Sequence, residues 1–204
     1  MARRIVDSGT SVVAFDLTAN FLKRAAERSV DYEDRIEFLQ GKVDDPEFLS
    51  SLGQNRSDAA VSTMALMDMP VVTLLAAPLP ILLKPGGKFV FSITHPVFKS
   101  GSRRIVIDEE DHSNQAVRNT SIQVFNYTKL HHCEGIGIVG QPEAHQYFHG
   151  STSSLINLFT DHGFVLDCLE EPVYKGERSN NKLTSTAYQE FPPFLFFGMN
   201  LERI

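Results

Sequence analysis

Short apolar segments alternate with amphipathic segments from the start of the chain, and this alternation constrains the fold more than any other feature. The run "SVVAF", residues 11–15, is almost wholly apolar, as expected for a strand covered on both faces. Asp16 follows, and "TANFLKRAAERS" then places apolar side chains on one helical face, with Thr18 as a plausible N-cap. A strand, an acidic residue and a helix in this order are typical of a nucleotide-binding βαβ unit.

The alternation continues to about residue 97. The sequence predicts strands at 35–40, 58–64 and 88–94 and helices at 46–52 and 70–84. Pro78 and Pro80 predict a bend or a break in the second helix. Strands joined by helices imply an α/β fold with a mainly parallel sheet and right-handed crossovers.

The pattern changes over residues 98–150, where no helical periodicity is visible. Alternating runs "RRIVID" and "SIQVFNY", separated by the polar stretch "DEEDHSNQAVRNTS", predict antiparallel strands. This insertion would lie beyond the carboxyl ends of the strands, where open α/β sheets bind ligands, so we expect a strand-rich lid. A helix at 151–163 follows, and two final strands without a helix between them predict an antiparallel pair at one edge of the sheet.

Composition excludes several classes of protein. A net charge of −6 implies no general affinity for nucleic acid or for anionic membranes. The longest apolar run, residues 71–83, is too short for a membrane span, and no signal peptide is visible, so we expect a cytoplasmic protein. Cys133 and Cys168 are then expected as reduced thiols. The sequence "HHC" at 131–133 lacks a second cluster, which favours ordinary loop residues over a metal site.

Four stretches, in this order, resemble the class I S-adenosylmethionine-dependent methyltransferases, in the small-molecule, methyltransferase-11-like branch. "VVAFDLTANFLKRA" is similar to that family's second strand and the helix after it, and "DAAVSTMALMDM" to its fourth strand and turn. "LLKPGGKFVFSITHP" is similar to the fifth strand, and "LINLFTDHGFVLDCLEEP" to the sixth strand with the helix before it. The resemblance implies a Rossmann-like sheet and a single methyltransferase-like domain at 1–204, with the lid inserted at about 98–150.

The resemblance assigns donor-binding roles to residues that follow the second and third strands of the family. Asp16, with Leu17 beside it, would accept hydrogen bonds from the ribose hydroxyls, and the alternative is that Asp16 only caps a helix. In "GKVDD" the adenine contact would be Asp44, with Val43 packed on the ring. The alternatives are that Asp44 only caps the next helix, or that Lys42, which cannot accept a hydrogen bond, takes its place.

The turn after the fourth strand of the family faces the methionine part of the donor. Thr63, Met64 and Ala65 are similar to that turn. Methionine suits a soft apolar wall, but filling of the core is an equal alternative for Met64, Met67 and Met69.

Four residues are candidates for contact with the methyl acceptor. His95, in "THP", could deprotonate or orient it, although a histidine in a turn is more often structural. Tyr147 and His149 could close over the acceptor, together with Phe148. Packing of the lid is the alternative, and it is stronger for Phe148 than for His149. No metal is expected.

The resemblance also implies that a strand and a glycine-rich loop are missing before residue 1, since "MARRIVDSG" is similar to the helix that follows that loop. The absent strand would be central, and each unpaired backbone group at its two neighbours would cost about 1–3 kcal/mol. Three explanations stay open: an N-terminally truncated sequence, direct pairing of the strands at 11–15 and 58–64, or a partner chain, as in a homo-oligomer. Direct pairing or a partner is favoured.

We therefore expect S-adenosylmethionine-dependent methyl transfer to an unidentified small molecule, impaired in these 204 residues, with weak or absent binding of the donor. The alternative is a non-catalytic methyltransferase-fold module for binding or oligomerisation. A third and weaker alternative is another nucleotide-using enzyme, such as a dehydrogenase.

Overall fold

The computed structural model describes residues 1–99, 103–112, 115–129, 131–136, 140, 142–176 and 187–202. The strands are β1 (Val12–Asp16), β2 (Ile36–Gln40), β3 (Ser57–Thr63), β4 (Leu83–Thr94), β5 (Arg103–His112), β6 (Gln115–Val124), β7 (His131–Gly135), β8 (His145–His149), β9 (Phe164–Glu170) and β10 (Phe194–Leu201). The α-helices are α1 (Ala2–Asp7), α2 (Ala19–Glu27), α3 (Pro46–Ser51), α4 (Thr73–Ala76), α5 (Leu79–Leu82) and α6 (Thr152–Thr160). Short 3₁₀-helices are η1 (Val30–Tyr32), η2 (Leu66–Asp68) and η3 (Ala187–Gln189).

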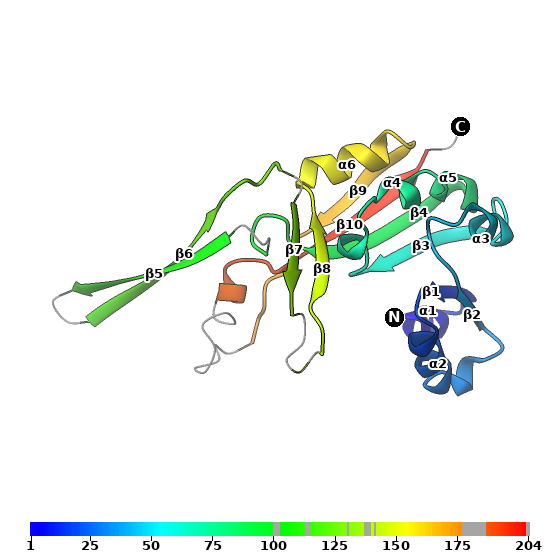
Figure 1. Cartoon of the computed structure of the whole chain (residues 1–204), viewed down its shortest axis with the longest axis horizontal. Helices are drawn as coiled ribbons and strands as arrows, with labels where there is room; N and C mark the ends of the chain where they lie inside the picture. Colours follow the sequence, from blue (N-terminus) through cyan, green and yellow to red (C-terminus); the bar gives the residue numbers. More distant parts are fainter. Residues whose placement is uncertain are drawn as a thin grey trace.

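The larger sheet has the strand order β3-β4-β10-β9 (Figure 1). β3 runs parallel to β4, whereas β10 is antiparallel to both β4 and β9. The antiparallel pair at the edge confirms what the two final strands predicted. The fold is therefore the expected mixed α/β architecture.

One face of this sheet carries the core. Alternate residues of β4 and β10 point to the same face, because side chains in a strand alternate between its two sides. Phe91, which is 1 % exposed, lies among three other phenylalanine rings. Its ring centroid is 4.9 Å from that of Phe89, 5.1 Å from that of Phe159 and 4.4 Å from that of Phe197. Residues of α4, α5 and α6 complete the cluster, so these helices cover that face.

Proline and glycine shape the connection into β4 as the sequence predicts. The helix expected at 70–84 is broken, because α4 ends at Ala76 and α5 starts only after Pro78. Gly87 then lies close to other backbone: a Cβ there would stand 2.8 Å from the carbonyl oxygen of Lys84. A side chain at this position would force the backbone to shift, so the "PGG" sequence has a steric reason.

The N-terminal part forms a second sheet of its own, β1-β2, with parallel strands. β1 does not pair with β3 among the described residues, so the expected direct pairing of these two strands is wrong. Figure 1 shows β1, β2, α1 and α2 beside the larger sheet, with α3 in the connection. The ring centroid of Phe48 in α3 lies 5.2 Å from that of Phe15, so α3 packs on β1 through side chains. A partner chain at the open edges stays a prediction.

The described part of the insertion is rich in strands, as predicted. β5 and β6 form an antiparallel hairpin, and β7 pairs with β8. The polar stretch expected to separate the first two strands instead belongs largely to them, and Arg118 lies 3.5 Å from Glu109 across the hairpin. Cross-strand charge pairs can replace apolar alternation on an exposed hairpin. The hydroxyl of Tyr127 accepts the backbone N–H of Thr152 at 2.9 Å and so fastens the insertion to the start of α6.

Candidate functional site

Asp16 ends β1 and has a carboxylate that is only partly engaged. One oxygen, Oδ1, accepts the backbone N–H of Thr18 at 2.7 Å, which accounts for the capping role that the sequence allowed. No hydrogen bond within the described residues engages Oδ2. The neighbouring backbone is held to β2, since Gly41 donates to the Asp16 carbonyl at 3.2 Å and Gln40 Nε2 donates to the Leu17 carbonyl at 3.1 Å. The half-buried carboxylate is thus fixed in place with one oxygen available.

The two acidic residues after β2 have different roles. Asp45 caps α3, where its carboxylate accepts the backbone N–H of Glu47 at 3.0 Å and that of Phe48 at 3.2 Å. Asp44 is exposed and takes no part in this cap, so its carboxylate stays available for a ligand. Val43 is half-buried and packs against the main core. Val43 therefore has a structural role whether or not an adenine ring lies on it.

The turn after β3 is conformationally unusual. Met64 has a φ of +54°, in the left-handed region that residues other than glycine rarely adopt. Its backbone N–H donates to the carbonyl of Ser92 in β4 at 2.9 Å, which holds the turn against the neighbouring strand. Strained backbone of this kind clusters at ligand sites, although the strain does not identify the ligand. Thr63 and Ala65 flank this residue.

An apolar cavity of about 330 Å³ lies beside this turn. Leu66 and Met67, which follow the turn directly, form one wall, and Thr94 lies at the carboxyl end of β4. Leu158 of α6 and Phe148 of β8 close the other sides. The cavity thus lies at the carboxyl edge of the sheet and against β8 of the insertion, where open α/β sheets bind ligands. Sequence reasoning named Met67, Met69 and Phe148 but did not bring them together.

A polar rim borders this cavity on η2 and β8, which pack together. Partial burial raises the pKa of Asp68, and the nearby His145 opposes that shift. Burial also raises the pKa of Tyr147, with further contributions from Asp68 and Cys133. Sequence reasoning missed Asp68; the available signal was a single acidic residue among apolar ones in "MALMDMP". His149 ends β8, but its side chain lies outside the described residues.

His95 is the most buried of the candidate site residues, with 3 % exposure. Its Nδ1 accepts the backbone N–H of Val97 at 3.1 Å and that of Phe98 at 3.4 Å. Its Nε2 lies 2.7 Å from Oε1 of Glu171. Because Nδ1 accepts, Nε2 carries the proton and donates to the carboxylate. Both ring nitrogens therefore have partners, and the ring fixes the turn between β4 and the lid.

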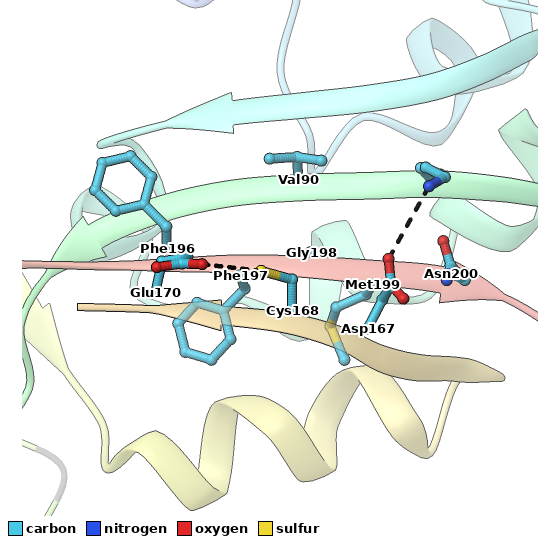
Figure 2. Close-up of a pocket in the computed structure, with 10 residues that line it drawn as sticks. Val90, Asp167, Cys168, Glu170, Phe196, Phe197, Gly198, Met199 and Asn200 are labelled. Carbon is cyan, nitrogen blue, oxygen red and sulfur yellow. Dashed lines mark hydrogen bonds and ion pairs between the residues drawn. The ribbon is translucent and has the colours of Figure 1, made fainter. Parts of the chain in front are cut away.

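A second hollow, of about 300 Å³, lies on the opposite face of the larger sheet. Figure 2 shows Val90 and Phe196 pointing to this side, while Phe197 and Met199 point toward the helix on the other side. Lys88 pairs with Asp167 across it at 4.0 Å. The hollow lies over the middle of the strands rather than at their carboxyl ends, so it is not the site that the sequence predicts.

Cys168 in this hollow should alkylate slowly. Desolvation raises the pKa of its thiol, and the carboxylates of Glu170 and Asp167 raise it further. A raised pKa lowers the thiolate fraction, and the thiolate is the reactive form. In a Cys133→Ser background at mildly alkaline pH, Glu170→Gln should increase the rate of reaction with iodoacetamide several-fold. An unchanged rate in that variant would contradict the electrostatic explanation.

Two further functional classes can be checked against the described residues. No group of three or more histidine, cysteine or acidic side chains among them could hold a metal ion. The "HHC" residues lie in β7, which corrects the expectation of a loop. None of the described helices has both the length and the apolar character that a bilayer crossing requires.

Comparison with known proteins supports the architecture. Residues 1–91 match the family model described as a methyltransferase domain. A putative S-adenosylmethionine-dependent methyltransferase from Listeria monocytogenes is similar to this chain with a TM-score of 0.70 and 19 % identity, covering 95 % of this chain and 81 % of the other. An S-adenosylmethionine-dependent methyltransferase from Mesorhizobium loti is similar with a TM-score of 0.67 and 20 % identity, covering 94 % of this chain and 80 % of the other.

A third similar structure is the glycopeptide N-methyltransferase MtfA complexed with S-adenosyl-L-homocysteine, with a TM-score of 0.57, 16 % identity and coverage of 97 % of this chain and 76 % of the other. No match was found among curated proteins. The fold comparison extends over nearly the whole chain, whereas the sequence match covers its first part. Residues 1–91 thus match the methyltransferase-domain model, and the chain has the fold of the class I S-adenosylmethionine-dependent methyltransferases.

Proposed function

We propose that this protein transfers a methyl group from S-adenosylmethionine to a small-molecule acceptor. The observation that carries the proposal is the apolar cavity directly after the Thr63–Ala65 turn, at the carboxyl edge of the sheet. Similar structures of MtfA complexed with S-adenosyl-L-homocysteine and with S-adenosyl-L-methionine support the choice of donor.

The available side chains suit the donor chemically. A nucleoside presents ribose hydroxyls and an amino group as hydrogen-bond donors, and carboxylates accept from both. Asp16 would hold the ribose through Oδ2, with Leu17 beside it, and Asp44 would accept from the adenine with Val43 against the ring. The Thr63–Ala65 turn would face the methionine part. The donor supplies an activated methyl group, so the chain's own residues need only hold the two reactants in line and exclude water.

The residues proposed to contact the methyl acceptor lie in the lid and in the turn after β4. We assign His95 a positioning role rather than that of a base, because both of its ring nitrogens already have partners. Tyr147, and His149 at the end of the same strand, would border the acceptor from β8. Asp68 adds a carboxyl group at this rim, where a polar part of the acceptor would meet it.

We further propose that the 204-residue chain binds the donor weakly. In this chain the residues predicted to bind the donor follow strands of two different sheets. No continuous ladder of strand hydrogen bonds within the described residues therefore holds Asp16 and Met64 in register. Weakening from micromolar to millimolar affinity corresponds to about 4 kcal/mol, which is the loss of a few hydrogen bonds.

Titration with S-adenosylhomocysteine, with binding detected by ligand-observed NMR, tests this function. We expect binding in the high micromolar to millimolar range and at least tenfold weaker binding by Asp16→Ala, because charge-assisted hydrogen bonds are lost. Glu27→Ala, an equal change of charge on the neighbouring helix, should bind like the parent chain.

The outcomes separate the two candidate functions. Equal binding by both variants would place the donor away from Asp16. No binding at saturating concentration would favour the non-catalytic binding or oligomeric module. Low micromolar binding would show that these residues suffice and would contradict the weak-binding proposal.

A further inference from the structure

The cavity between β4, α6 and the lid has an unusually uniform lining. Among the described residues, none of the side chains that line it is charged, and the polar ones are Thr73, Thr94 and Ser154. The remaining lining is aliphatic or aromatic, apart from Gly150, and includes the thioethers of Met67 and Met69. An ionised group placed there would lose its hydration without gaining a partner of opposite charge.

The size of the cavity limits what can fill it. An apolar cavity of about 150 Å³ is known to accept benzene. The present cavity, about 330 Å³, is roughly twice as large, so two fused rings match its volume. Methionine thioethers make favourable contacts with aromatic rings, which favours an aromatic over an aliphatic occupant.

The cavity also has a defined orientation. Leu66 follows the turn proposed to face the reactive end of the donor, whereas Leu155 and Leu158 contribute from the helix. A ring system seated against these leucines therefore has its near edge toward that turn. The polar rim of Asp68 and Tyr147 lies on the β8 side, outside the apolar lining.

We infer that the methyl acceptor is an uncharged, fused two-ring aromatic compound whose ring system fills this cavity. The inference rests on the proposed function only in naming the ligand a methyl acceptor. The selectivity of the cavity for such a ring system can be measured without any donor. The substrate class follows from the absence of charge in the lining, from its volume and from its position beside the turn.

Binding of 2-naphthol, measured by isothermal titration at neutral pH, is the direct test. 2-Naphthoate has the same rings with an ionised carboxylate, and we expect it to bind at least tenfold more weakly. Leu155→Trp fills the cavity and should abolish binding of 2-naphthol. Asn157→Trp is the matched control, because it adds the same side chain to an exposed position of α6 that does not line the cavity.

A second variant tests the inference even if Leu155→Trp does not fold. Leu155→Ala enlarges the cavity, so it should bind the three-ring probe 9-phenanthrol at least tenfold more tightly than the parent chain. Failure of the parent chain to bind 2-naphthol, equal affinity for 2-naphthoate, or undiminished binding by folded Leu155→Trp would each overturn the inference.

The donor titration separates this test from that of the function. If S-adenosylhomocysteine fails to bind while 2-naphthol binds selectively, the proposed function fails and the selectivity of the cavity is supported. If S-adenosylhomocysteine binds while 2-naphthol does not, the proposed function stands and the assigned substrate class is wrong.

Discussion

Replacing Phe91 with alanine is expected to lower the free energy of unfolding by about 3–5 kcal/mol. Phe91 of β4 is 1 % exposed, and its ring stacks on that of Phe197 of β10 with 4.4 Å between the ring centroids. Truncation removes the transfer free energy of the ring and leaves a cavity that β-strands on both sides cannot readily close. Since domains of this size are stable by about 5–15 kcal/mol, much of the folded population could be lost. Urea denaturation followed by circular dichroism measures the effect.

Phe196→Ala is the matched control for this prediction. Phe196 lies next in sequence to Phe197 but points to the opposite face of the sheet, where it is 39 % exposed. Its truncation should cost about 1 kcal/mol or less. An equal loss of stability in both variants would mean that a covering element protects the open face in solution.

Removal of His95 should have the second largest effect, a loss of about 1–3 kcal/mol of unfolding free energy. In His95→Ala the backbone N–H groups of Val97 and Phe98 lose their acceptor, and Glu171 loses a donor. Because these groups connect the end of β4 to the start of the lid and to the end of β9, the turn beside the cavity should also loosen. Thermal unfolding and 2-naphthol titration measure the two consequences separately.

Two conservative variants distinguish the hydrogen bonds at His95. His95→Asn keeps an acceptor near the position of Nδ1, so it should recover part of the stability lost in the alanine variant. Glu171→Gln keeps an acceptor for Nε2–H and should unfold close to the parent chain, since the Glu171 side chain is 54 % exposed. A large loss in Glu171→Gln would instead mean that the charge of the carboxylate matters. Full stability in His95→Ala would contradict the structural role.

The local elements could be predicted because their causes lie within a few residues. Apolar runs such as residues 11–15 and 88–94 form strands, and Asp45 with Pro46 begins a helix. Pro78 breaks the helix between β3 and β4, and Gly87 fits a backbone contact that excludes a side chain. In each case the deciding interaction is steric or a hydrogen bond between near neighbours in the chain.

Other features depend on contacts between distant residues. The apolar cavity joins Leu66 to Phe148 and Leu158, which lie more than eighty residues further along the chain, and no local pattern pairs them. The sequence makes His95 a candidate base. In the structure its Nε2 is hydrogen-bonded to Glu171, 76 residues away, and its Nδ1 accepts a backbone N–H from the turn that follows it.

The sequence alone therefore determined the order of strands and helices up to β4 and after β8, the antiparallel end of the sheet and the Asp16 position at the end of β1. The tertiary structure decided that β1 and β2 stand apart from β3, against the expected pairing. Phe48 from α3 packs on Phe15, which nevertheless stays 36 % exposed, and Val13 of the same strand is 39 % exposed. Local sequence sets which residues are apolar, whereas long-range packing sets which surfaces meet, because hydrophobic burial is non-directional.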